Sequence, residues 1–152
     1  MNNFKNDVKF GNDGEKIICL YLILQGMEYV SYNNNYKYDL EMYSNKEKRN
    51  VLFEVKTDAY EDTGNIAIET QYKGRDSGIT HTEAEWFVYF YSTLPFNNVW
   101  MIRVKELKKL IEDNDFKVVM GGDDNQSELV LIPRKEHKKD FRIDTIKLTK
   151  NN

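Results

Sequence analysis

Two short segments in which apolar and polar residues alternate constrain the fold most strongly. Residues 36–43 and 51–57 both have the period of two that is typical of β-strands, and the polar run SNKEKRN lies between them. This arrangement predicts a β-hairpin. In its second strand the alternation places Val51, Phe53 and Val55 on one face, and Glu54 and Lys56 together on the other.

The remaining segments predict both helices and strands. We expect a buried helix over 13–25 that ends at Gly26, a third strand over 65–71, and an aromatic helix over 79–92 with a Thr82-x-x-Glu85 capping box. We then expect a strand over 98–104, a short helix over 105–114, and a closing pair of strands over 116–120 and 128–133. This order predicts an α/β fold in which helices flank a mixed central sheet.

Length and composition limit the class of protein. A chain of 152 residues with 40% hydrophobic residues is long enough for one domain, 1–152, with a proper core. Cys19 is the only cysteine and falls inside the predicted buried helix, so it is a core residue rather than a nucleophile. There is neither a signal-peptide pattern nor an apolar run of about 20 residues. We therefore expect an intracellular, cytoplasmic protein that does not contact membranes.

Charge is unevenly distributed along the chain. The net charge is -3, but the segment from Pro133 to the end has seven basic and three acidic residues and carries +4. This segment can be a solvated, lysine-rich tail or a DNA-binding arm, and we favour the tail.

The charged positions of the predicted hairpin indicate a metal site. Pairing of the two strands can bring Asp39 beside Glu54, where the two carboxylates repel each other unless a cation lies between them. Mg²⁺ takes one or two protein carboxylates and leaves other positions for water and phosphate oxygens. Glu15, at the start of the first helix, can point at the same place or can serve only the helix dipole.

These residues resemble the pattern of the PD-(D/E)XK nucleases, which consists of a helix glutamate, a strand aspartate and Glu-x-Lys on the next strand. Here the pattern reads Glu15, Asp39, and Glu54 with Lys56, while Tyr38 stands where the motif has proline. The layout is most similar to small Holliday-junction resolvases of archaeal and phage type and to related phage endonucleases. The resemblance implies a restriction-endonuclease-like core over about 11–104, followed by C-terminal strands and a basic tail over 116–152.

The resemblance also implies roles for individual residues. Asp39, Glu54 and the Val55 carbonyl would hold Mg²⁺, for which Mn²⁺ could substitute. Lys56 would orient the attacking water or stabilise developing charge, and Glu15 would bind a second metal ion or a water molecule on it. The expected reaction is hydrolysis of phosphodiester bonds in DNA, with Holliday junctions or other branched DNA as candidate substrates. The enzyme could be phage-encoded and act in the host cytoplasm.

Residues after the hairpin supply further candidates. The resemblance implies that Glu69 or Gln71, on the third strand, supports the site from behind the metal ligands, whereas the simpler interpretation is an exposed polar face. In the following loop, Lys73 and Arg75 supply charge, and Ser77 and Thr80 place hydroxyls before a helix N-terminus. That loop can bind a nucleic-acid phosphate or can be an ordinary loop with a helix cap.

Other functions are compatible with the same residues. The fold could serve as a non-catalytic nucleic-acid-binding or protein-interaction module, or the nuclease could act on RNA or on unbranched DNA. His81 and His137 are too far apart in sequence to indicate a zinc site. A homodimer is plausible because junction and duplex cutters need two active sites, with the aromatic segment 84–91 or the final strands as the contact.

Overall fold

The computed structural model describes residues 13–33, 37–58, 63–93, 96–122 and 124–147. The helices are α2 (Asp13–Leu24), α3 (Val104–Glu112) and α4 (Arg134–His137), with 3₁₀ turns η1 (Gly78–Thr80) and η2 (Lys138–Asp140). The strands are β1 (Met27–Tyr32), β2 (Leu40–Ser44), β3 (Arg49–Asp58), β4 (Asn65–Tyr72), β5 (Arg75–Asp76), β6 (Trp86–Thr93), β7 (Phe96–Arg103), β8 (Lys117–Gly121), β9 (Ser127–Pro133) and β10 (Arg142–Lys147). None of the described helices has the length and apolar content that crossing a membrane requires.

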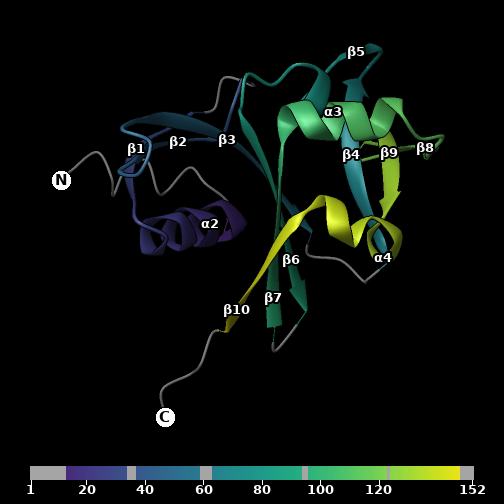
Figure 1. The fold of residues 1–152 in the computed structure, drawn as a ribbon. Coiled ribbons are helices and arrows are strands. Elements are labelled where there is room, and N and C mark those ends of the chain that lie inside the picture. The colour runs from purple at the N-terminus through teal and green to yellow at the C-terminus, as the bar shows by residue number, and fades with distance from the viewer. Residues whose placement is uncertain (1–12, 34–36, 59–62, 94–95, 123, 148–152) are drawn as a thin grey trace.

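The strands form two sheets (Figure 1). The larger sheet has six strands in the order β1-β2-β3-β6-β7-β10 and is mixed, because β3 and β6 run parallel while the other neighbours are antiparallel. The smaller sheet has four strands in the order β5-β4-β9-β8 and is antiparallel. The α/β class and the mixed sheet are as the sequence predicts, and the second sheet was not expected.

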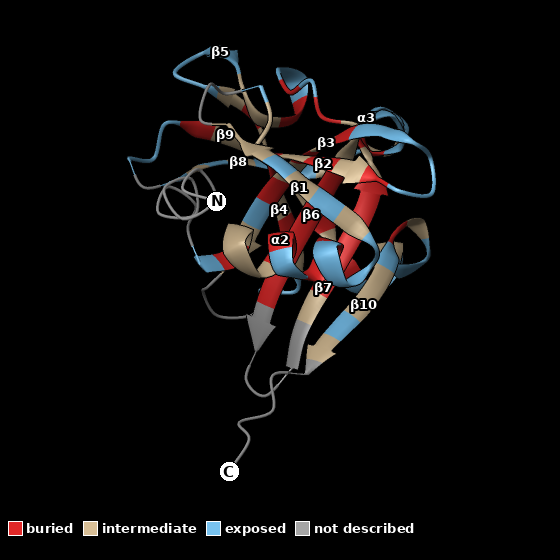
Figure 2. Ribbon diagram, turned by 90° about the vertical axis from the view of Figure 1, so that its left-hand side faces the viewer, coloured by how far each residue is buried: buried red, intermediate tan, exposed pale blue. Residues whose placement is uncertain are grey.

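The larger sheet is covered on both faces, which gives the molecule two apolar cores. On one face α2 packs over the inner strands, with Ile18 and Leu22 against Met42 and Phe53. On the other face Phe87 and the other large side chains pack against the second sheet and α3. Figure 2 shows that buried positions concentrate in the central strands, whereas β1 and β10 at the edges carry exposed residues.

The N-terminal half follows its sequence pattern closely. The helix predicted over 13–25 is α2, and Cys19 is buried in it with 5% exposure. The hairpin predicted over 36–43 and 51–57 is β2 and β3, although residue 36 lies outside the described residues. Leu40 pairs with Phe53 at the end of the hairpin ladder, and Asp39 directly precedes this pair, on the side from which Glu54 follows Phe53. The prediction that the hairpin brings Asp39 beside Glu54 is confirmed, because both side chains line one pocket.

The aromatic helix predicted over 79–92 is wrong. Its first part is the short turn η1, and its aromatic part is β6, a central strand of the larger sheet. A strand that is buried on both faces is apolar at nearly every position, so it lacks the alternation that identifies other strands. Thr82 and Glu85 form no capping box; Glu85 instead pairs with Arg49 and Arg103. Because β6 is interior, it cannot supply a dimer contact.

The predicted solvated tail is also wrong for residues 134–147. This segment forms α4, η2 and β10, and β10 pairs with β7 over six residues. Arg134 is buried, and its guanidinium lies 4.0 Å from the centroid of the Tyr91 ring. Residues 148–152 lie outside the described part of the chain. Much of the basic charge is therefore built into the sheet and its flanking turns.

Candidate metal centre

Asp39 lies at the point where the chain enters β2. Its backbone N–H donates to the carbonyl of Phe53, the residue that pairs with Leu40, at 2.9 Å. Its side chain crosses to β3, where Oδ2 accepts the Val55 N–H at 2.7 Å. The carboxylate is thus fixed at the edge of β3, beside Glu54.

Glu54 projects from the middle of β3 on the face opposite the α2 core. The burial pattern of β3 alternates as its sequence predicts, with Val51, Phe53 and Val55 buried on the other side. Glu54 Oε2 lies 3.0 Å from the hydroxyl of Thr82, which is itself buried and within 2.9 Å of the Lys37 carbonyl. The segment before β6 therefore holds the Glu54 carboxylate in place.

Glu15 reaches the same region from the first turn of α2. This approach depends on Gly14, because a Cβ at that position would lie 1.9 Å from Thr57 Oγ1 of β3. The Glu15 carboxylate forms a hydrogen bond with the Tyr32 side chain, and burial together with this carboxylate raises the pKa of Tyr32 to about 12. The structure thus brings Glu15, Asp39 and Glu54 together, as the sequence interpretation requires.

The three carboxylates repel one another in a partly desolvated place. Burial, followed by the charge of Glu54, raises the pKa of Asp39 to about 8, although the Val55 N–H opposes the rise. Burial also raises the pKa of Glu54, and the charges of Glu15 and Glu69 add to this, while Thr82 and Lys56 oppose it. A group of carboxylates that resists ionisation is one whose charge a cation would stabilise.

The oxygen atoms near Asp39 fit a hard divalent cation. The Phe53 carbonyl and the Val55 N–H both face Asp39. Because the N–H and C=O of one strand residue point to the same edge, the Val55 carbonyl also faces this side, beyond the last β2–β3 pair. Two carboxylates and one carbonyl are the donor number and type that Mg²⁺ uses when water and phosphate fill its other positions.

No third protein side chain completes this donor set. Within the described ranges, no group of three or more His, Cys, Asp or Glu residues is gathered closely enough to hold a metal ion. Glu15 therefore contributes negative charge beside the pair, and its binding of a second ion stays a prediction. The geometry fits a site that relies on water and substrate for its remaining ligands.

Lys56 follows Glu54 on the same face of β3 and is exposed. Its positive charge lowers the pKa of Glu54, so the two side chains interact electrostatically. A small cavity of about 120 Å³ lies between β3 and β4, and Glu54, Lys56 and Glu69 are among the residues that line it. Lys56 is thus placed next to the carboxylates, where the sequence pattern requires it.

Glu69 and Gln71, the two candidates on β4, have different positions. Glu69 faces the site, but its two oxygens accept hydrogen bonds from Ser77 Oγ at 2.5 Å and Ser127 Oγ at 2.7 Å. The β4–β9 register shifts between Glu69 and Gln71, as in a β-bulge. Tyr72 lines the site and Gln71 does not.

The loop after β4 differs from the predicted phosphate cradle. Lys73 forms the turn between β4 and β5, and Arg75 and Ser77 line the pocket next to Glu54. No α-helix follows, because η1 has three residues. The Thr80 hydroxyl donates to backbone carbonyls, with the Thr70 oxygen 2.5 Å away, and Thr80 does not line the pocket. The prediction of a helix N-terminus at this loop is wrong.

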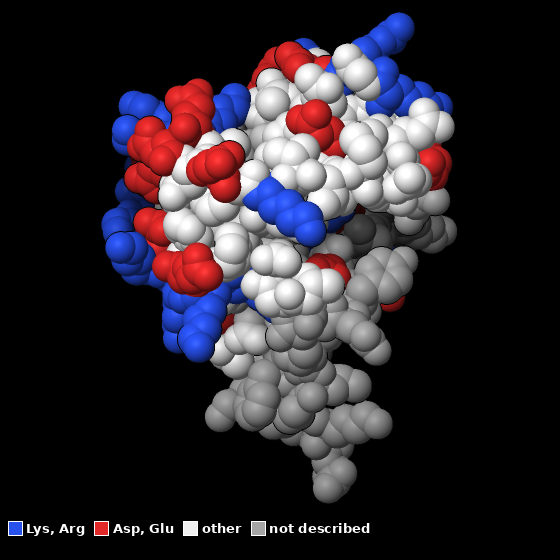
Figure 3. Space-filling model, turned by 90° about the vertical axis from the view of Figure 1, so that its right-hand side faces the viewer, with Lys and Arg blue, Asp and Glu red and all other residues white. Residues whose placement is uncertain are grey.

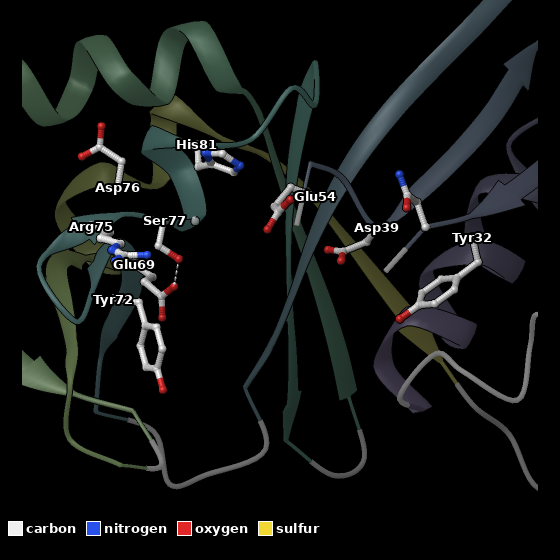
Figure 4. Close-up of a pocket in the computed structure, with 11 residues that line it drawn as sticks. Tyr32, Asp39, Glu54, Glu69, Tyr72, Arg75, Asp76, Ser77 and His81 are labelled. Atoms are coloured by element: carbon white, nitrogen blue, oxygen red, sulfur yellow. Dashed lines mark hydrogen bonds between the residues drawn. The ribbon is translucent and has the colours of Figure 1, made fainter. Parts of the chain in front are cut away.

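The carboxylates open into a pocket of about 610 Å³ between the two sheets (Figure 4). Asp39 and Glu54 lie on the side of the larger sheet, and Glu69, Tyr72 and Ser77 lie on the opposite side. The sequence interpretation did not single out several residues that line this pocket: Tyr32, Asn33, Tyr72, Asp76 and His81. Only the pairing of distant strands brings them together, so no local pattern could have identified them.

Comparison with known proteins adds no relative from which function could be transferred. No protein-family model, curated protein or solved structure matches the chain. The function therefore has to be argued from the site itself.

Proposed function

We propose that this protein is a metal-dependent DNA endonuclease of the PD-(D/E)XK type, which hydrolyses phosphodiester bonds. The observation that carries the proposal is the proximity of Asp39 and Glu54 beside Val55, with the charge of Glu15 nearby and Lys56 on the same face as Glu54. The order of these residues resembles that of the family pattern, with Tyr38 in the place of its proline. A mixed sheet with α2 on one face supports a restriction-endonuclease-like core.

Each side chain has a definite task in this proposal. Asp39 and Glu54, with the Val55 carbonyl, would hold Mg²⁺ or Mn²⁺, and Glu15 would serve a second ion. A bound divalent ion would neutralise charge on the phosphate and lower the pKa of the attacking water. Lys56 would orient that water or stabilise the charge that develops on the phosphate oxygens. Val55 N–H and Thr82 fix the Asp39 and Glu54 carboxylates before substrate arrives.

A cleavage assay with defined DNA substrates tests the proposal. Labelled four-way junction, fork, duplex and single strand are incubated with Mg²⁺, Mn²⁺ or EDTA. We expect cleavage that requires metal and that falls at least about 100-fold in Glu54→Gln, equivalent to about 2.7 kcal/mol of transition-state stabilisation. Glu28→Gln, which changes an exposed glutamate of β1, is the matched control and should cleave like the wild type.

The alternative functions give different results in the same assay. A non-catalytic module on this fold would cleave none of the substrates with any metal, although it would remain folded. A nuclease for RNA would cleave a matched oligoribonucleotide and leave every DNA substrate intact. Either result would remove the proposal of a DNA endonuclease.

A further inference from the structure

The pocket that holds the carboxylates has the size of a small-ligand site. Its volume of about 610 Å³ lies within the range of roughly 300–1,000 Å³ that is typical of pockets for single small molecules. Its walls come from different sheets, with Asp39 and Glu54 on one side and the β4–β5 hairpin on the other. A phosphate that reaches Asp39 and Glu54 must therefore bring its own sugar and base between these walls.

Two tyrosines stand on opposite sides of this pocket. Figure 4 shows Tyr32 on the side of the larger sheet and Tyr72 on the side of the smaller one, with the carboxylates between them. The Tyr72 side chain is 38% exposed, while its hydroxyl donates to Asp124 Oδ2 at 2.6 Å. The Lys73 ammonium lies 5.1 Å from the Tyr72 ring centroid. Tyr72 is thus an exposed aromatic surface held in position at the mouth of the site.

The charge around the pocket does not favour binding through phosphates alone. Its described lining has four carboxylates, namely Asp39, Glu54, Glu69 and Asp76, and one guanidinium, that of Arg75. On the face of the molecule that carries β8 and α4, basic and acidic side chains are interspersed (Figure 3). Duplex DNA is bound mainly by rows of cations along its two backbones. Single-strand binding also uses cations along the backbone, but each base that stacks on an aromatic ring adds about 5- to 150-fold in affinity that an intact duplex, whose bases are paired and stacked, cannot gain in this way.

We propose that the pocket admits one unstacked nucleotide, so that the substrate is a single strand or an unpaired segment rather than an intact duplex. The base would stack on Tyr72, and its phosphate would reach Asp39 and Glu54. This inference rests on the proposed nuclease function for its catalytic meaning, but the binding it describes can be measured without cleavage. Stacking does not read the sugar, so DNA and RNA single strands share this chemistry.

Fluorescence anisotropy in EDTA tests the inference with three labelled ligands of equal charge per strand length. These are a single-stranded oligodeoxynucleotide, the same strand with an abasic site at each position, and a hairpin duplex. We expect the single strand to bind most tightly, and the abasic strand to lose affinity although its phosphates remain. Tyr72→Ala should weaken single-strand binding by about 5- to 150-fold, which is the range for loss of one stacked base.

Two variants serve as controls in the same titration. Tyr72→Phe keeps the ring and loses only the bond to Asp124, so it should bind like the wild type. Tyr43→Ala removes a tyrosine of β2 that does not line the pocket and should also bind normally. Thermal unfolding of each variant establishes that it is folded, and the abasic ligand tests the wild type independently of any variant.

The outcomes separate this inference from the proposed function. Equal binding of the abasic and normal strands, or tighter binding of the duplex, would overturn the single-nucleotide pocket even if Mg²⁺-dependent cleavage is present. Tight single-strand binding that depends on Tyr72, without cleavage of any substrate in Mg²⁺, would support the pocket and refute the nuclease. An oligoribonucleotide bound as tightly as DNA would support the pocket, since the argument requires only an unstacked base.

Discussion

Replacement of Asp39 by asparagine should stabilise the protein when metal is absent. Asparagine has nearly the same shape, and its carbonyl oxygen can still accept the Val55 N–H that Asp39 Oδ2 accepts at 2.7 Å. The substitution removes one of the negative charges that repel each other at the site. A residue placed for function rather than stability should behave in this way, because its charge costs folding free energy until a cation binds.

The size and pH dependence of this effect follow from the pKa of Asp39. It is raised from 3.8 to about 8 in the folded protein. The folded state therefore binds more protons than the unfolded state between these pH values, and the free energy of unfolding falls as pH rises from about 4 to about 8. The whole shift in the pKa of Asp39 corresponds to a loss of roughly 6 kcal/mol in the free energy of unfolding above pH 8. Burial and, next, the charge of Glu54 cause this shift, and because Glu54 shares the repulsion we assign about 2–3 kcal/mol above pH 8 to removal of the Asp39 charge.

Urea unfolding of wild type and Asp39→Asn in EDTA, from pH 5 to pH 8.5, measures this difference. The variant should be more stable by about 2–3 kcal/mol at pH 8.5, and the gain should become smaller toward pH 5. Glu28→Gln, which removes an exposed carboxylate on β1, should not raise the free energy of unfolding to a comparable extent. An Asp39→Asn protein that is no more stable than wild type at pH 8.5 would refute the reasoning that these carboxylates repel one another.

Three other substitutions test separate parts of the site. Lys56→Met should lower the single-turnover cleavage rate by about 100-fold while Mn²⁺ affinity stays similar, and an unchanged rate would remove Lys56 from the mechanism. Thr82→Val should lower the free energy of unfolding by about 1–2 kcal/mol, because the Lys37 carbonyl and Glu54 lose a buried partner. Thr82→Ser keeps the hydroxyl and should unfold at the wild-type midpoint in the same urea titration. Gly14→Ala should cost about 1–3 kcal/mol of stability, because its Cβ meets β3, and an unchanged urea midpoint would contradict the close approach of α2.

The parts of the fold that the sequence predicts correctly are those encoded by local patterns. The apolar stripe of α2 and the alternation in β2 and β3 are visible within single segments, and a hairpin limits which residues can face each other. The proximity of Asp39 and Glu54 could therefore be predicted. The roles of these residues could be proposed only because the same segments carry a family-like pattern.

The parts that failed depend on contacts between distant segments. The aromatic run of β6 reads as a buried helix until the second sheet is known to cover its other face. The β4–β9 register shifts after Glu69, and Tyr72 rather than Gln71 lines the site. Nothing in the local sequence predicts this shift. The strand β10 was not predicted because its charged residues, which are common on edge strands, resemble those of a solvated tail.

The pocket shows the same limit in functional terms. Its far wall comes from β4 and β5, and β4 is held in place by pairing with β9, more than fifty residues further along the chain. The two tyrosines on which the proposed single-strand binding draws, Tyr32 and Tyr72, carry no motif of their own. Sequence reasoning could propose a reaction for this chain, whereas the type of strand it takes had to be inferred from the assembled walls.

The central claim is that Asp39 and Glu54 hold a divalent metal ion, and calorimetric titration of the purified protein with Mn²⁺ tests it most directly. We expect saturable Mn²⁺ binding by the wild type at pH 8, weakened at least about tenfold in both Asp39→Asn and Glu54→Gln and unchanged in Glu28→Gln. Wild type that binds no Mn²⁺, or variants that bind it as tightly as wild type, would contradict the account.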